Sequence, residues 1–72
     1  MTFGEALTIA MEQNNIDAVT LSRKSGVSTP YISKVRSGAT LDPSWPKACA
    51  LIDALGMTLD EFLKIQRSDE NS

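Results

Sequence analysis

Turn signals divide this chain into five short segments, and within the segments apolar residues recur at helical spacing. No segment alternates apolar and polar residues in the way that is typical of a strand. The pattern therefore predicts an all-α fold. The helix starts are marked by two capping boxes, Thr2 with Glu5 and Thr58 with Glu61, and by single N-cap residues, Asp17 and Ser28.

The expected helices also have definite ends. Gly26, the Ser37-Gly38 pair and Gly56 are helix stops, because glycine readily takes the left-handed backbone found at a helix C-terminus. A loop that contains Pro43 and Pro46 separates the third helix from the fourth. We expect helices from Phe3 to the Asn14-Asn15 pair, from about Ala18 to Ser25, from Thr29 to Ser37, from about Trp45 to Leu55, and from Thr58 to about Arg67.

The length of the chain, 72 residues, is enough for one domain. A domain of this size buries only roughly 60% of the surface of its unfolded chain, so it has one modest core and little room for a deep catalytic pocket. Apolar residues make up 42% of the sequence, which is typical of a folded chain. We expect the folded domain to cover residues 1–67 and a disordered polar tail to cover residues 68–72.

The numbers of cysteine and histidine residues exclude several classes of protein. There is one cysteine and no histidine, so neither zinc-finger spacing nor a disulfide framework is present. Cys49 lies in an apolar run and is expected to be a buried thiol. No apolar run is long enough to cross a membrane, and no signal peptide opens the chain. We expect no metal, cofactor, small-molecule ligand or membrane contact, and a cytoplasmic, nucleoid-associated location in a bacterial or phage-infected cell.

The basic residues are concentrated in one part of the chain. The formal net charge is −2, but residues 18–41 contain Arg23, Lys24, Lys34 and Arg36 and no acid. This stretch carries +4, so the remainder carries −6 (−2 minus +4). A basic island in an acidic chain is a candidate electrostatic footprint for nucleic acid, and solvated surface charge is the plain alternative. Arg23 and Lys24 fall near a helix end, where we expect them to complement the helix dipole rather than to contact DNA.

Residues 21–38 contain the pattern that bears most on function. Two short helices meet at the turn Gly26-Val27-Ser28, where Gly26 suits a left-handed backbone and Val27 fills the corner between the helices. Ile32 and Val35 are three residues apart, so both face inward and hold the second helix of the pair against the first. The outward face of that second helix is mostly short and polar, as a face inserted into a DNA groove can be: Thr29, Pro30, Ser33, Lys34 and Ser37.

This stretch resembles the Cro and cI-type phage repressors, an XRE-like family of helix-turn-helix domains with the lambda-repressor-like fold. The similarity extends from Phe3 to Phe62 and agrees in register and length. The resemblance implies a five-helix bundle whose third helix lies in the major groove and whose second helix crosses the phosphate backbone. Outside the helix pair, it rests on Pro43-Ser44-Trp45 and on Ala54-Leu55-Gly56-Met57-Thr58-Leu59-Asp60-Glu61-Phe62.

The resemblance also implies roles for single residues. Lys34 is the only long donor at the positions that usually meet base edges, and Pro30, which lacks a donor, is expected to touch a thymine methyl. For Tyr31 two roles remain open, packing on the second helix or a hydroxyl bond to phosphate. The expected base contacts are Thr29, Pro30, Ser33 and Lys34, and the expected phosphate contacts are Ser28, Tyr31, Arg36, Ser37, Thr40 and Lys47.

Two features depart from the family pattern. Many members begin the second helix with glutamine, whereas this chain has Ala18 at that position, directly after Asp17. An amide contact is thereby lost, and the acid Asp17 stands where a phosphate is expected to approach. Relatives usually join the first and third helices by an arginine–glutamate ion pair, and here Met11 and Arg36 stand at those two positions. We expect Met11 to pack on the alkyl stem of Arg36, which frees the guanidinium for solvent or phosphate.

Together these features predict a stand-alone, sequence-specific DNA-binding transcriptional regulator. A phage Cro-like repressor, a restriction-modification controller and a small antitoxin-type autoregulator all fit the sequence. The alternative is a protein-interaction module that kept the fold without binding DNA, which the low pI of about 4.8 and Asp17 favour. An enzyme is not expected, because the chain has no histidine to serve as a base and the Asp60-Glu61 pair is explained by helix capping.

The last expected helix is the candidate dimer interface. Leu59, Phe62 and Leu63 recur at spacings of three and four and form a core-facing stripe, whereas Ile65 falls off that stripe and is expected to be exposed. Relatives commonly pair near this helix, and one recognition helix reads only a few base pairs. We therefore expect a homodimer, at least on DNA, with Leu63 and Ile65 at its interface and with palindromic half-sites roughly 34–36 Å apart.

Overall fold

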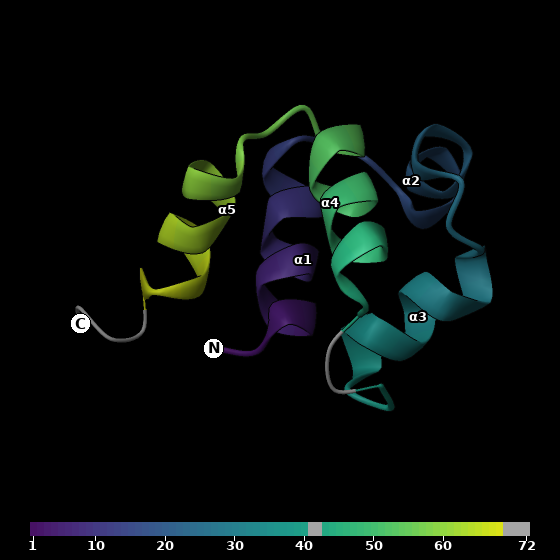
Figure 1. The fold of residues 1–72 in the computed structure, drawn as a ribbon, viewed down its shortest axis with the longest axis horizontal. Helices are drawn as coiled ribbons and strands as arrows, with labels where there is room; N and C mark the ends of the chain where they lie inside the picture. Colours follow the sequence, from purple (N-terminus) through teal and green to yellow (C-terminus); the bar gives the residue numbers. More distant parts are fainter. Residues whose placement is uncertain (41–42, 69–72) are drawn as a thin grey trace.

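Five α-helices make up the computed structural model of the chain, which describes residues 1–40 and 43–68. None of these residues lies in a strand, and no helix that they form is long and apolar enough to span a membrane. The expected all-α fold is thus confirmed. The helices are α1 (Phe3–Gln13), α2 (Ala18–Ser25), α3 (Thr29–Ser37), α4 (Trp45–Ala54) and α5 (Leu59–Gln66) (Figure 1).

The predicted capping boxes form at the starts of α1 and α5. Thr2 Oγ1 accepts a hydrogen bond from the N–H of Glu5 at 3.1 Å, and the Glu5 carboxylate accepts one from the N–H of Thr2 at 3.0 Å. Thr58 and Glu61 repeat this arrangement. The start of α4 differs from the expectation, because Pro46 lies in its first turn and not in the preceding loop. A proline is tolerated there since the first turn of a helix leaves its N–H groups unpaired.

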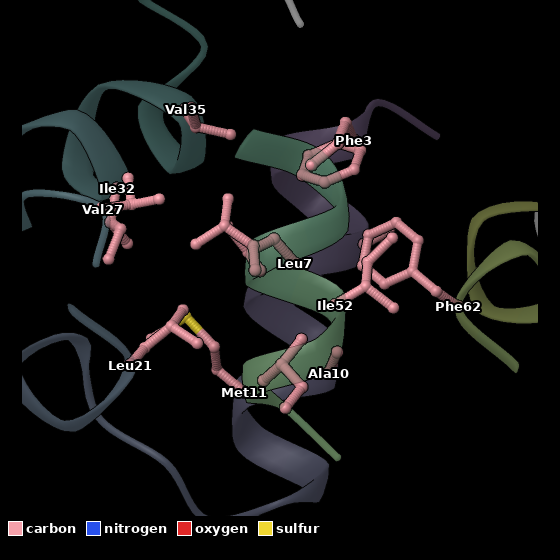
Figure 2. Close-up of a cluster of buried hydrophobic side chains, with 14 residues drawn as sticks. Phe3, Leu7, Ala10, Met11, Leu21, Val27, Ile32, Val35, Ile52 and Phe62 are labelled. Atoms are coloured by element: carbon pink, nitrogen blue, oxygen red, sulfur yellow. The ribbon is translucent and has the colours of Figure 1, made fainter. Parts of the chain in front are cut away.

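α1 lies at the centre of the molecule, with α3 on one side and α5 on the other (Figure 1). α2 packs against α3 and α4, and α4 also contacts α5. The aromatic rings of Phe3 and Phe62 lie 4.8 Å apart and join the start of α1 to α5. The apolar faces of the five helices meet in one core (Figure 2), whose largest fully buried side chains are Phe62, Leu7, Leu21, Ile32, Leu51 and Val35.

α1 and α3 make their closest approach at Gly4. A Cβ atom on Gly4 would collide with the backbone carbonyl of Val35, so a larger residue fits only if one helix moves. This contact sets the distance between α1 and α3 and therefore the position of the outward face of α3. No sequence pattern predicts this contact of Gly4, because a glycine inside a helix indicates a close approach only when the neighbouring helix is known.

Two expectations for α5 are wrong. Leu59 is 40% exposed and does not join the core, whereas Ile65 is half-buried and packs against the core. Leu59 and Ile65 are each three residues from Phe62, so they lie about 60° to either side of it around the helix, and the core covers the Ile65 side. The N-terminus lies beside the end of α5. The Met1 ammonium donates to the carbonyl of Gln66 at 3.2 Å, and the Gln66 amide donates to the carbonyl of Met1 at 3.3 Å. Phe62, which is 1% exposed, is the most buried residue of α5. Ile65 packs against the core next to it.

Cys49 is half-buried, not buried as its apolar neighbours indicated. α4 turns Ala48 and Ile52 to the core, and Cys49 is about 100° around the helix from Ala48. It borders a small hollow that Met57 also lines. The apolar residues of α4 thus extend around more of the helix circumference than the core covers.

Two expected features fall partly outside the described residues. Residues 41–42 of the loop before α4 lie outside them, as do residues 69–72 of the expected tail. Ser68, the first residue of that tail, is described, and its hydroxyl donates to the carbonyl of Ile65 at 2.8 Å. The extent of the folded domain over residues 1–67 stays a prediction.

Candidate nucleic-acid interface

The turn between α2 and α3 has the geometry that its sequence predicts. Gly26 has a φ of 76°, a left-handed value that glycine accommodates, and its N–H donates to the carbonyl of Ser22 at 2.9 Å. Val27 is only 7% exposed, and its N–H donates to the Ser25 hydroxyl at 3.1 Å. The Val27 side chain fills the corner between the helices, as expected, and so fixes the direction in which α3 leaves α2.

α3 turns one face to the core and the opposite face to solvent. Ile32 and Val35 have almost no exposed surface, which confirms that they face inward (Figure 2). Thr29 is half-buried at the first turn. The outward face consists of exposed residues, and we call it the α3 strip: Pro30, Ser33, Lys34 and Ser37. The residues expected at base edges thus lie together, and their contact with DNA stays a prediction.

Ser37 and Thr40 are tied to the end of α3. The Ser37 hydroxyl donates to the carbonyl of Lys34 at 3.2 Å, and the N–H of Thr40 donates to the same carbonyl at 3.3 Å. The Ser37 oxygen also accepts from the N–H of Ala39 at 3.4 Å. A hydroxyl has a single proton to donate, so Ser37 can donate to a phosphate only after its hydrogen bond to the Lys34 carbonyl breaks.

Arg36 is held against α1. Its Nε donates to Thr8 Oγ1 at 3.2 Å, and the Thr8 hydroxyl donates in turn to the carbonyl of Gly4 at 2.9 Å. Arginine has five N–H donors and this bond uses one, so the exposed guanidinium can still bind an anion. Met11 borders the same hollow as Arg36, and its packing on the Arg36 stem stays a prediction. The sequence contains no signal for Thr8, whose role depends on how α1 crosses α3.

Lys47 is held over an aromatic ring on the other side of α3. Its Nζ lies 4.1 Å from the centroid of the Tyr31 ring, a cation–π contact between α4 and α3. Tyr31 is half-buried and packs against the core, whereas Lys47 is exposed. The ring therefore supports the ammonium group from one side. The sequence suggested a phosphate role for each residue but not their contact, because they belong to different helices.

The two anchored cations flank the α3 strip. Tyr31 and Arg36 are five residues apart, which is about 140° around a helix, and the buried residues Ile32 and Val35 lie within that arc. The α3 strip occupies the remaining arc. A helix with its side chains is roughly 10–12 Å wide and the major groove is about 12 Å wide. The two edges of α3 are therefore separated by about the width of a major groove, and contact of either cation with phosphate stays a prediction.

The start of α2 carries an acid that opposes anion binding. Asp17 Oδ1 accepts from the N–H of Thr20 at 2.8 Å, and this hydrogen bond holds the pKa of the Asp17 carboxyl below its ordinary value. The ionised side chain occupies a helix N–H that could otherwise donate to an anion. The positive charge that acts on the Asp17 carboxyl is that of Arg23, in the last turn of the same helix, and Asp17 and Arg36 both border a hollow of about 380 Å³.

Comparison with known proteins agrees with this geometry. The model of a helix-turn-helix family, HTH_3, matches residues 7–62 and so includes α2, α3 and the turn between them. Neither the curated proteins nor the solved structures give a match. HTH_3 is the XRE family of Cro/C1-type domains, which confirms the resemblance drawn from the sequence, and it is a family of DNA-binding regulatory domains and not of enzymes. The chain therefore belongs to the HTH_3 family of helix-turn-helix domains, a family of DNA-binding transcription regulators.

Proposed function

We propose that this protein is a sequence-specific transcriptional repressor of the phage or small bacterial kind, which inserts α3 into the major groove of double-stranded DNA. The observation that carries the proposal is the exposed α3 strip between two anchored cations, Arg36 and Lys47. The strip offers side chains to base edges, and the cations lie at the edges where the phosphates of the groove pass.

Sequence readout is assigned to the first turns of α3. Lys34 has the reach and the charge to donate to O6 and N7 of guanine. Ser33 and Thr29 add short hydroxyl groups, and the Pro30 ring offers an apolar contact to a thymine methyl. Because Thr29 is half-buried while the other three are exposed, we expect Thr29 to contribute least to base preference.

Phosphate binding is assigned to the residues around the strip. Arg36 and Lys47 supply the charge, and Tyr31 supports Lys47. Ser28 stands at the N-terminus of α3, where helix N–H groups attract an anion. The residues proposed to bind phosphate, with Tyr31 acting through its support of Lys47, are Ser28, Tyr31, Arg36, Ser37, Thr40 and Lys47.

The repressor is proposed to act as a homodimer on a palindromic operator. One α3 helix reads only a few base pairs, and two-fold pairing doubles the number of base pairs that are read. Leu63 is half-buried and remains a candidate for the interface. Ile65 is not retained, because its side chain packs against the core of its own chain.

A protein-interaction module is the second candidate function. The acidic balance of the chain, with a pI of about 4.8, and the ionised Asp17 at the start of α2 favour it. Both features oppose the binding of DNA, which is a polyanion, whereas the α3 strip and its two flanking cations favour DNA binding. DNA binding is proposed first because Lys34, Arg36 and Lys47 lie on or beside α3, the helix that the family resemblance places in the major groove.

Selection of bound duplexes from a random library, followed by fluorescence anisotropy, tests the proposal. The selected duplex should bind at least about 10³-fold more tightly than a scrambled duplex, and affinity should fall steeply with salt. Arg36→Ala should weaken binding to every duplex and lower the salt slope by about one. Arg23→Ala, in the last turn of α2, is the matched control. The proposal fails if no duplex is enriched and none binds at low salt, a result that favours the interaction module.

A further inference from the structure

A polar hollow of about 360 Å³ lies between α1 and α3, beside the α3 strip, and we call it the α1–α3 hollow. The described residues that line it carry three hydroxyl groups and one guanidinium, and none of them is an acid: Thr8, Ser33, Arg36 and Ser37. Hydroxyl and guanidinium groups donate hydrogen bonds, and the guanidinium adds a positive charge. The α1–α3 hollow therefore has the chemistry of an oxyanion site.

Arg36 borders the α1–α3 hollow with most of its donors available. Its Nε donates to Thr8 Oγ1 at 3.2 Å, and no other described residue forms a hydrogen bond or an ion pair with the guanidinium. The N–H groups of both Nη atoms therefore remain. A guanidinium often binds phosphate through a pair of parallel hydrogen bonds from such groups.

Thr8 positions the guanidinium and does not itself donate to an anion. Its hydroxyl donates to the carbonyl of Gly4 at 2.9 Å, so the single proton of the hydroxyl is already used. The same oxygen accepts from Arg36 Nε and holds one side of the guanidinium against α1. Because a donor that is already held loses less conformational freedom on binding, this contact favours the capture of an anion by Arg36.

The two serines of the hollow differ in how readily they can donate. The Ser37 hydroxyl donates to the carbonyl of Lys34, whereas no described residue forms a hydrogen bond with the Ser33 hydroxyl. Ser33 and Arg36 are three residues apart, which is about 60° around a helix, so both can reach one anion. Ser33 can therefore donate to that anion without breaking an existing hydrogen bond.

We propose that the α1–α3 hollow holds one phosphate of the DNA backbone, bound by the Arg36 guanidinium and the Ser33 hydroxyl, with Thr8 as a positioning residue. The proposal rests on the proposed function, since it assigns one phosphate of the DNA that α3 reads to a defined site. A phosphodiester offers a pair of unesterified oxygens to the forked guanidinium. The Ser33 proton goes to the phosphate, and the lone pairs of its oxygen remain to accept from a base.

A second hollow beside Arg36 is a poorer site for an anion. Glu12 and Asp17 line that hollow, and carboxylates repel a phosphate. The described lining of the α1–α3 hollow contains no carboxylate and includes two residues of the α3 strip. The difference in charge between the two hollows therefore favours binding of the phosphate on the side of Arg36 that borders the strip.

A scan in which one phosphate of the selected duplex at a time is replaced by a neutral methylphosphonate tests the assignment. At one position in each half-site, the replacement should weaken wild-type binding about tenfold. That loss of affinity should nearly vanish in Arg36→Ala and should shrink in Ser33→Ala. Lys47→Ala, which removes the cation at the other edge of α3, is the matched control. It should show the full loss at this position and a reduced loss at a different one.

Two results of the scan would overturn the proposal. One is a loss of affinity that is as large in Arg36→Ala or in Ser33→Ala as in the wild type at every position. The other is a loss that vanishes at the same position in Lys47→Ala, because the phosphate would then respond to net positive charge and not to the α1–α3 hollow.

Dimethyl phosphate, a small phosphodiester, gives a readout that does not need DNA. Added to the protein alone, it should shift the NMR signal of the Arg36 Nε–H in a saturable way, and chloride at the same ionic strength should not. Arg23, in the last turn of α2, is the internal control, and equal shifts at both arginines would overturn the proposal. If the wild type binds no duplex, the proposed function fails and DNA is excluded as the source of the phosphate. A saturable shift at Arg36 would then support a site for a free phosphodiester.

Discussion

Arg36 and Thr8 join α3 to α1 through one hydrogen bond, from Arg36 Nε to Thr8 Oγ1, at 3.2 Å. Thr8→Val keeps the shape of the side chain and removes the hydroxyl, so the guanidinium loses its anchor. Because a hydrogen bond contributes about 0.5–1.5 kcal/mol, we expect affinity for every duplex to fall roughly two- to tenfold. Thr8→Ser retains the hydroxyl and should bind like the wild type. Equal affinity of Thr8→Val and Thr8→Ser in an anisotropy titration would show that this bond does not position Arg36.

Tyr31 has two possible roles that one pair of variants distinguishes. Tyr31→Phe keeps the ring beneath Lys47 and loses the hydroxyl, whereas Tyr31→Leu loses both. An exposed cation–π contact contributes about 0.5–1 kcal/mol, so Tyr31→Leu should weaken DNA binding roughly two- to fivefold, and Tyr31→Phe should leave it unchanged. A loss of affinity in Tyr31→Phe as large as that in Tyr31→Leu would assign the hydroxyl, and not the ring, to phosphate binding.

Asp17→Asn should strengthen DNA binding. The amide oxygen still accepts from the N–H of Thr20, so the cap of α2 is retained, while the negative charge at the start of α2 is removed. Exposed charges interact only weakly through water, so we expect a gain of up to about fivefold at low salt that disappears at high salt. Asp53→Asn, on the exposed side of α4, is the control for the change in net charge. A gain of the same size in the control would show that net charge alone is responsible.

The same variant tests the pH dependence of stability. The hydrogen bond from Thr20 lowers the pKa of Asp17 in the folded state, so its carboxylate stabilises the fold at pH values above the ordinary aspartate pKa of about 3.9. That contribution is lost as the pH falls through the lower folded pKa. Thermal unfolding between pH 6 and pH 3 should therefore show a smaller loss of stability for Asp17→Asn than for the wild type. Parallel curves would contradict this account of the cap.

Gly4→Ala should destabilise the protein although alanine is the better helix former. Helix propensity alone would add about 1 kcal/mol of stability, but the new Cβ meets the carbonyl of Val35 and forces α1 and α3 apart. Overpacking of this kind costs about 1–3 kcal/mol. Urea unfolding measures the difference, with Gln13→Ala at the exposed end of α1 as the control. A gain in the free energy of unfolding for Gly4→Ala would show that the helices separate without cost.

Local chemistry accounts for the parts of the fold that the sequence predicted. A capping box, a left-handed glycine and the spacing of Ile32 and Val35 each act within a few residues, and all three take the expected form. The contacts that position the candidate site are of another kind. Thr8 with Arg36, and Tyr31 with Lys47, are pairs from different helices. Their contacts depend on how those helices cross, which no short pattern encodes.

The errors in α5 have the same origin. Periodicity gives the angle between two residues around a helix but does not say which neighbour covers each side. The N-terminal residue, Met1, hydrogen-bonds to the end of α5, and Ile65 packs inward while Leu59 stays partly exposed. The apolar hollow between α4 and α5, which Trp45 and Leu59 line, could not be predicted from either helix alone because it forms only where the two helices pack.

Lys34→Ala provides the most direct test of the central claim that the α3 strip reads DNA sequence. Lys34 is the only long donor on that strip and is exposed. Duplex selection with the wild type and the variant should show that preference is lost at one base pair in each half-site, with affinity for the selected duplex lowered by about 1–3 kcal/mol. Preference at the other base pairs should be unchanged. An equal loss of affinity for all duplexes, with the selected sequence unaltered, would contradict the claim and place Lys34 at a phosphate.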